Sequence, residues 1–139
     1  MKPFDYFLKT ELVRKIRVDV NRAKALLKDA KSRIRDLKQI DKSKVPKLFF
    51  EYTYDALRDF CDSILFLDGY KSYSHEASIS YLFKKGFDVS VIEQFNLFRY
   101  KRNALRYYGE KISVKDAQDI FNFYLKIKNK LNSILRELK

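Results

Sequence analysis

The sequence predicts an all-α protein, an up-and-down bundle of four long helices and one short helix. Glycine and proline are rare, with 3 Gly and 2 Pro in 139 residues, which leaves little material for hairpins and long loops. Apolar residues recur at steps of three and four along most of the chain, as they do on one face of an α-helix. Where this spacing breaks, the chain carries residues that begin or end helices, so each break predicts a helix boundary.

The first long helix is predicted over residues 4–40, because neither proline nor glycine occurs there. A helix of this length exceeds the ordinary size in globular proteins, so we expect a kink within it. Its apolar residues keep helical spacing at Leu12, Ile16, Val20, Ala23, Leu27, Ala30, Ile34 and Leu37.

The second long helix is predicted over residues 44–67, with Ser43 as its cap and Pro46 in its first turn. Two neighbouring lines of apolar residues run along it, one of them through Phe50 and Leu57. An apolar face of this width favours a central position in the bundle, with neighbours on two sides.

Three further helices are predicted, a short one at 75–85 and long ones at 91–108 and 114–138. Ser74, Ser90 and Ser113 are expected to cap their first turns, the last of them in a capping box. Gly86 is expected to end the helix at 75–85, and Gly109 is expected to end the helix at 91–108. No repeat or low-complexity tract occurs, so the whole chain, residues 1–139, is expected to form one domain.

Composition excludes several classes of protein. Hydrophobic residues make up 46% of the chain, which is too rich for a disordered protein. No window approaches the apolar length of a membrane span, and the N-terminus lacks an apolar signal region. The single cysteine, Cys61, lies in an apolar stretch and is expected to be a core thiol. Together these features predict a cytoplasmic protein.

Positive charge is concentrated in the N-terminal third. The net charge is +12, and residues 1–47 carry 15 Lys and Arg against 6 Asp and Glu. This imbalance favours a polyanion or an acidic protein as partner, although a basic surface also serves solubility. On a helix over residues 4–40 many basic residues share one face. Two interpretations of this face remain, a surface that only contacts solvent and a surface that contacts nucleic acid. The candidate contacts in this stripe are Lys24, Lys28, Lys31 and Arg35.

Most signatures of catalytic and cofactor sites are absent from the sequence. It contains no Gly-rich phosphate loop and no Cys/His cluster. Asp55, Asp59 and Asp62 share a helical face, but an acidic stripe that faces the basic helix is favoured over a metal site, because no further ligand is indicated. Neither a metal nor a cofactor is therefore predicted.

Residues 99–109 alternate densely between basic and aromatic groups. Helical spacing places Arg102 near the apolar face, where a charge is costly unless it is paired with an opposite charge or serves to bind a ligand. Guanidinium groups suit phosphate and aromatic rings suit bases, so this segment is a candidate RNA-binding site. The alternative is an ion pair between Arg102 and an aspartate of the second helix. The accompanying candidate contacts are Arg99, Lys101, Arg106 and Tyr108.

Residues 44–139 carry three pieces that resemble the HEPN (higher eukaryotes and prokaryotes nucleotide-binding) family, particularly its small prokaryotic members. They are YTYDALRDF at 52–60, GYKSYSHEA at 69–77 and RNALRYYG at 102–109. The resemblance implies an up-and-down bundle, commonly a homodimer whose two arginine motifs face one cleft. Unburied apolar surface also favours a homodimer, since this small domain holds 12 Phe and 10 Tyr.

Many members of that family are metal-independent ribonucleases, often toxins paired with a nucleotidyltransferase antitoxin. Arg102 and Asn103 match the start of their motif, but Tyr107 stands where the motif has histidine. Tyrosine side chains have an ordinary pKa of about 10 and exchange protons poorly at neutral pH. The only histidine, His75, is expected at the start of the short helix as a surface or capping residue.

The resemblance and this departure together predict an RNA- or nucleotide-binding domain without efficient catalysis. Two alternatives stay open. One is a metal-independent endoribonuclease toxin that uses Arg102, Asn103 and Tyr107. The other is a non-catalytic protein that docks a nucleotidyltransferase partner through its basic helix.

Overall fold

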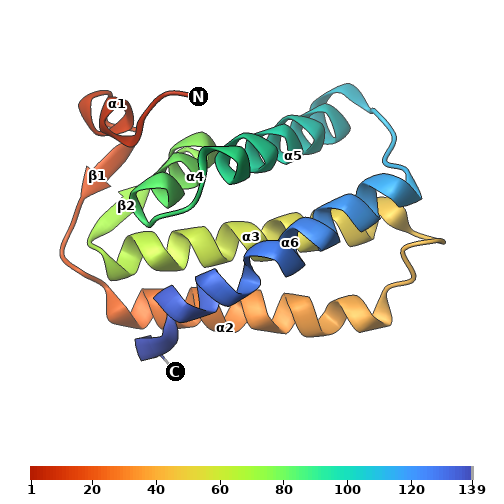
Figure 1. Cartoon of the computed structure of the whole chain (residues 1–139), viewed down its shortest axis with the longest axis horizontal. Helices are drawn as coiled ribbons and strands as arrows, with labels where there is room; N and C mark the ends of the chain where they lie inside the picture. Colours follow the sequence, from red (N-terminus) through yellow and green to blue (C-terminus); the bar gives the residue numbers. More distant parts are fainter. Residues whose placement is uncertain (139) are drawn as a thin grey trace.

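Four long helices form most of the molecule, and a two-stranded sheet lies at one end (Figure 1). The computed structural model describes residues 1–138, and 74% of the chain is helical, so the predicted all-α class is confirmed. The long helices are α2 (Val20–Asp36), α3 (Pro46–Leu67), α5 (Val89–Tyr108) and α6 (Val114–Ile134). The shorter elements are α1 (Phe4–Lys9), α4 (His75–Lys84), two 3-10 turns, η1 (Leu37–Gln39) and η2 (Arg136–Leu138), and the strands β1 (Val13–Lys15) and β2 (Tyr70–Ser72).

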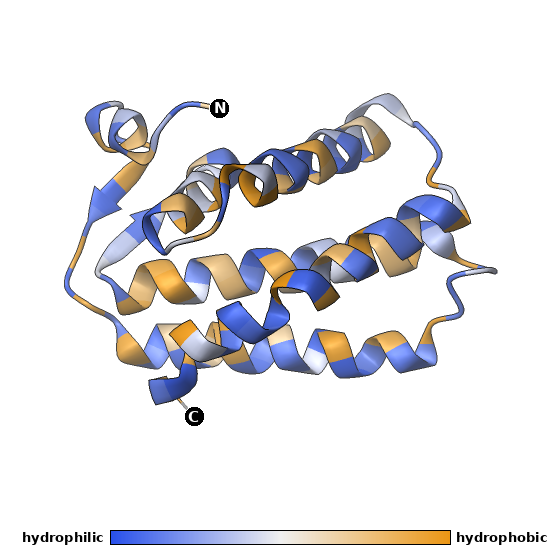
Figure 2. Cartoon of the chain, viewed as in Figure 1, coloured by the Kyte–Doolittle hydropathy of each residue, from blue (hydrophilic) through white to orange (hydrophobic). Residues whose placement is uncertain are grey.

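Helix α3 occupies the centre of the bundle. Helices α2, α4, α5 and α6 all contact it, as the wide apolar face of this segment predicts. Phe50, Tyr54, Leu57, Phe60 and Ile64 are fully buried along its length. In Figure 2 much of α3 has apolar colours, whereas α2 and α6 alternate between polar and apolar turns. Each buried side chain of this size contributes about 1.5–3 kcal/mol of hydrophobic free energy to folding.

A single helix over residues 4–40 is wrong, because the chain leaves helical geometry between α1 and α2. Glu11 adopts a left-handed backbone with φ of 60°. The following strand, β1, pairs antiparallel with β2, so the molecule also contains a small two-stranded sheet that the predicted bundle of helices lacks. Asp19 then begins α2 by accepting a hydrogen bond from the Arg22 N–H at 3.0 Å.

Tertiary pairing explains this break. Val13 is buried in the sheet, whereas Leu12 and Val20, which helical spacing assigns to the core, are exposed. Hydrogen bonds from the Ile16 N–H to the Gly69 carbonyl and from the Asp19 N–H to the Phe66 carbonyl hold the extended segment against the end of α3. The sheet and these bonds satisfy backbone groups that a helix would otherwise pair internally.

Most other predicted helix ends are confirmed within two or three residues. Ser74 caps α4, Ser113 forms the predicted capping box of α6, and Gly109 ends α5 with φ of 67°. Two predicted caps are wrong. The Ser43 hydroxyl donates to Asp41 instead, and α5 begins at Val89, one residue before Ser90.

The lone cysteine lies in the core as predicted, and burial raises the pKa of the Cys61 thiol. Within residues 1–138 no helix has both the length and the apolar character needed to cross a bilayer.

Candidate anion-binding site

Charged and polar side chains that can bind a ligand are concentrated around an open pocket of about 430 Å³ between α3, α4 and α5. Helix α3 contributes one arginine, the first turn of α4 contributes a histidine and a glutamate, and the second half of α5 contributes three arginines. The lining residues are Arg58, Ser74, His75, Glu76, Arg99, Arg102, Asn103, Arg106 and Tyr107. We refer to this cavity as the arginine pocket.

Arg102 lies at the base of the arginine pocket and is only 9% exposed. Its Nη2 donates to Asp55 Oδ1 at 3.3 Å, so the predicted ion pair with an aspartate of α3 is present. Its guanidinium carbon lies 5.0 Å from the centre of the Tyr54 ring, a cation–π arrangement. The Nε atom is buried and has no hydrogen-bond partner among residues 1–138. A buried N–H of this kind is costly unless it meets an acceptor.

The other three arginines of the pocket each have a carboxylate partner, at a separation longer than a normal hydrogen bond. The separations are 3.5 Å for Arg99 and Glu76, 3.8 Å for Arg58 and Asp62, and 4.0 Å for Arg106 and Glu51. Charge-assisted hydrogen bonds are usually 2.7–2.9 Å long, and each guanidinium carries five N–H donors. These loose contacts therefore balance charge but leave most donors available to an anion.

His75 lies in the same pocket, against α3. Its Nδ1 is 3.4 Å from the Tyr54 hydroxyl, and the two rings stack with centres 6.1 Å apart. Burial lowers the pKa of His75 to about 4, and the positive charges of Arg58, Arg102 and Arg99 act in the same direction. The imidazole is therefore neutral at pH 7. His75 begins α4 as predicted, but it is half-buried in the pocket and is more than a surface residue.

The structure brings together only some of the residues that the sequence suggests. Arg99, Arg102, Asn103, Arg106 and Tyr107 all line the arginine pocket. The others lie elsewhere, and they are Lys101, Tyr108, Lys24, Lys28, Lys31 and Arg35.

These outlying residues lie in three different parts of the molecule. Lys101 Nζ donates to Asp116 Oδ1 at 2.6 Å, on the side of α5 that faces α6. Tyr108 is 81% exposed at the end of α5. The four basic residues of the N-terminal stripe belong to α2, which lies on the opposite side of α3 from α5 (Figure 1).

Sequence reasoning missed Arg58 and His75 as members of this site. Both lie within the segments that carry the family resemblance, at 52–60 and 69–77, and this was the available signal. Helical spacing could not show that they converge with Arg102, since three separate helices meet here.

The three aspartates on one face of α3 each have a basic partner. Asp55 pairs with Arg102 of α5, and Asp59 lies 3.2 Å from Arg33 of α2. Asp62 lies 3.8 Å from Arg58 and accepts a hydrogen bond from Ser78 at 3.0 Å. Burial raises the pKa of Asp59 to about 6 and also raises the pKa of Asp62. Among the described residues no group of His, Cys, Asp or Glu could hold a metal ion. Only Asp59 therefore faces the basic helix α2, whereas Asp55 faces α5 and Asp62 faces α4, so the expected acidic stripe along α2 is present at one of its three positions.

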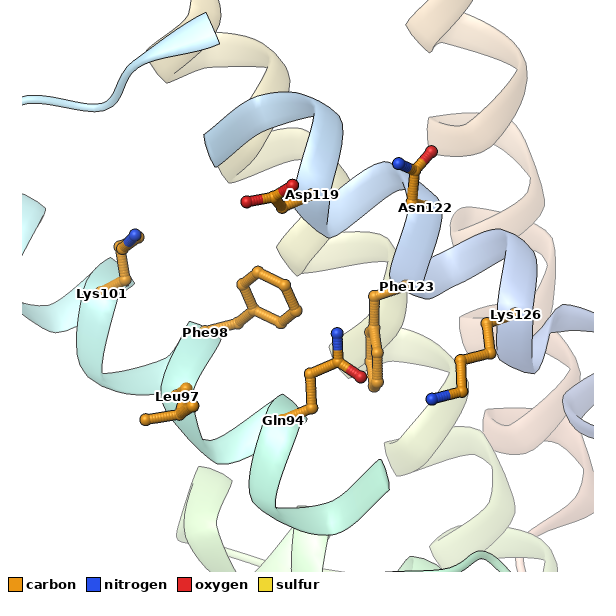
Figure 3. Close-up of a pocket in the computed structure, with 8 residues that line it drawn as sticks. All are labelled: Gln94, Leu97, Phe98, Lys101, Asp119, Asn122, Phe123 and Lys126. Atoms are coloured by element: carbon orange, nitrogen blue, oxygen red, sulfur yellow. The ribbon is translucent and has the colours of Figure 1, made fainter. Parts of the chain in front are cut away.

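A second pocket, of about 500 Å³, lies between α5 and α6 and has a different chemical character (Figure 3). The rings of Phe98 and Phe123 lie at its centre, 5.4 Å apart. Figure 3 shows Lys101 and Lys126 at its edges, on different helices. With an aromatic floor and only scattered charges, this pocket lacks the convergent donors of the arginine pocket.

Comparison with protein-family models, with curated proteins and with solved structures found no match for this chain. The chemistry of the arginine pocket therefore carries the functional assignment. Four guanidinium groups, an amide and a neutral imidazole around one open cavity suit a ligand that is anionic, rich in acceptors and of nucleotide size.

Proposed function

We propose that this chain is an RNA- or nucleotide-binding domain of the HEPN type that lacks efficient catalysis. The observation that carries the proposal is the convergence of four arginines on one pocket, with the Nε of Arg102 buried and unpartnered within residues 1–138. The helical bundle agrees with the family resemblance in fold class.

Phosphate is the anion that these groups suit best. Arginine presents planar donor pairs that match two phosphate oxygens, and Asn103 adds an amide in the same pocket. Tyr107 is 73% exposed at the edge of the pocket, where its ring is free to stack on a base. A phosphate group at the bottom of the pocket and a nucleobase stacked on Tyr107 at its edge together describe a nucleotide.

Weak catalysis is expected from the proton-transfer groups that the pocket contains. Cleavage of RNA by its 2′-hydroxyl needs a base that exchanges protons near neutral pH. His75, whose pKa is about 4, is a weak base and holds no proton to donate at pH 7. Tyrosine at 107, where the resemblance implies histidine, does not fill this role.

A metal-independent ribonuclease is the second candidate, and one observation favours it. His75 lines the same pocket as Arg102 and Asn103, so a histidine does stand within the site although the motif position lacks one. Incubation of the chain with RNA in the presence of a chelator separates the candidates. Efficient cleavage that His75→Gln abolishes would replace the binding proposal with the ribonuclease.

A homodimer belongs to the same proposal. Large apolar side chains are exposed on α4, at Phe83, and on α5, at Val89, Leu97 and Tyr100. Exposed apolar groups on neighbouring helices are typical of association surfaces. Light scattering at micromolar concentration should give the mass of a dimer, and a monomer mass would contradict this part. Pairing with a nucleotidyltransferase rests on the family resemblance alone.

Fluorescence anisotropy with a labelled single-stranded RNA tests the binding proposal. Arg106→Ala should weaken binding about tenfold, because a charge-assisted contact to phosphate is worth about 1.5–3 kcal/mol and this side chain is half-exposed. Arg136→Ala, an exposed arginine outside the pocket, is the matched control. Absence of RNA and nucleotide binding at low salt would overturn the proposal.

A further inference from the structure

Exposure falls steeply from the edge of the arginine pocket to its base. The exposed fraction is 73% for the whole of Tyr107, and for the side chains alone it is 48% at Arg106, 14% at Arg99 and 10% at Arg102. The most buried donors therefore lie deepest. A chain terminus can approach these donors more readily than an internal phosphodiester, since the latter must continue on both sides.

The first turn of α4 adds backbone donors to the wall of this pocket. The Ser74 N–H is bonded to Ser72 Oγ at 3.2 Å, and the Ala77 N–H is bonded to Ser74 Oγ at 3.3 Å. The N–H groups of His75 and Glu76 precede the first residue that has an intrahelical acceptor. A helix N-terminus also favours negative charge. Independently of α4, the nine-tenths buried Arg102 has an unpartnered Nε within the described chain.

Charged groups surround His75 on every element that packs against it. Helix α3 contributes Arg58 and the neutral Tyr54, and α5 contributes Arg99 and Arg102. On α4 itself, Glu76 neighbours His75 and pairs with Arg99. Two further carboxylates lie behind the arginines, where Asp55 contacts Arg102 and Asp62 contacts Arg58.

A bound dianion favours the protonated, positively charged form of the His75 imidazole. Burial is the largest cause of the low His75 pKa and persists when a ligand binds, whereas the ligand compensates the three arginines and adds its own negative charge. An opposite charge within a few ångströms shifts a pKa by about 1–3 units toward the charged form. A terminal phosphate carries about −1.5 to −2 charges at pH 7, more than an internal diester.

We propose that the arginine pocket recognises a terminal phosphate, the phosphomonoester at the end of a nucleotide or RNA strand, and that His75 takes up a proton when this group binds. This inference rests on the proposed function and narrows it to one class of ligand. Arg99 and Arg102 hold the phosphate at the base, the first turn of α4 faces it, and protonated His75 becomes a further donor.

Proton NMR tests the coupling directly, because His75 is the only histidine and its ring signal needs no assignment. In the free protein the signal should titrate near pH 4. With saturating adenosine 5′-monophosphate the midpoint should rise by about one pH unit or more. Adenosine, which lacks the phosphate, should leave the midpoint unchanged. A midpoint unmoved by bound nucleotide would overturn the proton uptake.

A pair of matched oligonucleotides tests the class of ligand. The same short RNA, with a 5′-phosphate or with a 5′-hydroxyl, should differ about tenfold in affinity at pH 6.5, which is the effect of about one strong charged contact. Equal affinities would overturn the preference for a terminal phosphate and leave RNA binding through internal phosphates. Failure of both oligonucleotides and of the nucleotide to bind would instead overturn the proposed function.

His75→Gln isolates the role of this residue without adding or removing charge at neutral pH. Between pH 7 and pH 5 the ratio of wild-type to variant affinity for adenosine 5′-monophosphate should rise about twofold if the pKa rises by one unit, and more if it rises further, because only the wild type gains a proton at position 75. Titration of the phosphate itself affects both proteins equally and cancels in the ratio. A constant ratio would mean that His75 does not respond to the ligand.

Discussion

Arg102 shows how one side chain can be both a structural partner and a candidate ligand group. Its pairing with Asp55 crosses from α5 to α3, and its Nε is buried without an acceptor in the part of the chain that the structure describes. Breaking a buried pair from one side leaves a carboxylate without compensation, although Asp55 is about one-third exposed and water softens the loss.

Arg102→Met should lower the free energy of unfolding by about 1–3 kcal/mol, because it leaves Asp55 without its buried partner. Adding Asp55→Asn should recover part of that loss, since the uncompensated charge disappears. Urea denaturation of the wild type, both single variants and the double variant measures the coupling. Additive effects would show that the pair contributes nothing beyond its separate side chains.

His75 should make stability depend on pH. Its folded pKa of about 4 lies below the ordinary value of 6.5. The unfolded chain therefore binds more protons between these values, and the free energy of unfolding falls as the pH is lowered from about 6.5 toward 4. His75→Gln should reduce this fall, as measured by thermal denaturation across the pH series. The raised pKa of Asp59 acts in the opposite direction in both proteins and cancels from their difference.

At the scale of elements, the join between β1, α3 and β2 depends on Gly69. Its backbone has φ of 86°, and a Cβ added there would lie 3.1 Å from the Ile16 carbonyl oxygen. That oxygen belongs to the extended segment that interrupts the predicted first helix. A side chain at position 69 therefore strains its own backbone and crowds the segment that β1 leads into.

Gly109→Ala is a matched control for Gly69→Ala, because Gly109 has φ of 67° but no atom within 4 Å of an added Cβ. Both changes should cost about 1–2 kcal/mol for left-handed backbone. Gly69→Ala should cost more, since it adds the contact with the Ile16 carbonyl oxygen. Chemical denaturation measures both, and equal losses would show that the chain around Ile16 moves aside without cost.

At the scale of the whole molecule, the net charge of +12 is spread over more than one basic surface that a polyanion could contact. The arginine pocket lies between α3, α4 and α5, whereas the exposed Lys24 and Lys28 belong to α2, across α3 from α5. Under the proposed function, a mononucleotide is expected to occupy the pocket alone, whereas a longer RNA is expected to contact α2 as well. The two ligands therefore distinguish local from distributed binding.

Lys24→Glu combined with Lys28→Glu should weaken the binding of a long RNA and leave the affinity for adenosine 5′-monophosphate unchanged. Each phosphate contact to a single strand contributes about 0.7 to the slope of log affinity against log salt, so loss of two contacts should lower the slope by roughly 1.4. Anisotropy titrations over a series of salt concentrations measure this. An unchanged slope would mean that α2 is a solvated face only.

The sequence by itself determined the helical class, the end of α5 at Gly109 and the caps at Ser74 and Ser113, because these are local properties of backbone and spacing. It also placed Arg102 at the apolar face, since helical periodicity needs no knowledge of neighbours.

Only the tertiary structure decided the break after α1 and the membership of the arginine pocket. Residues 13–15 carry no interruption of helical spacing, and they become a strand because residues 70–72 offer partners. Arg102 meets Asp55 across 47 positions of sequence, and Tyr54 meets His75 across 21. Such approaches depend on how α3, α4 and α5 pack, and no local pattern in the chain encodes the distance between them.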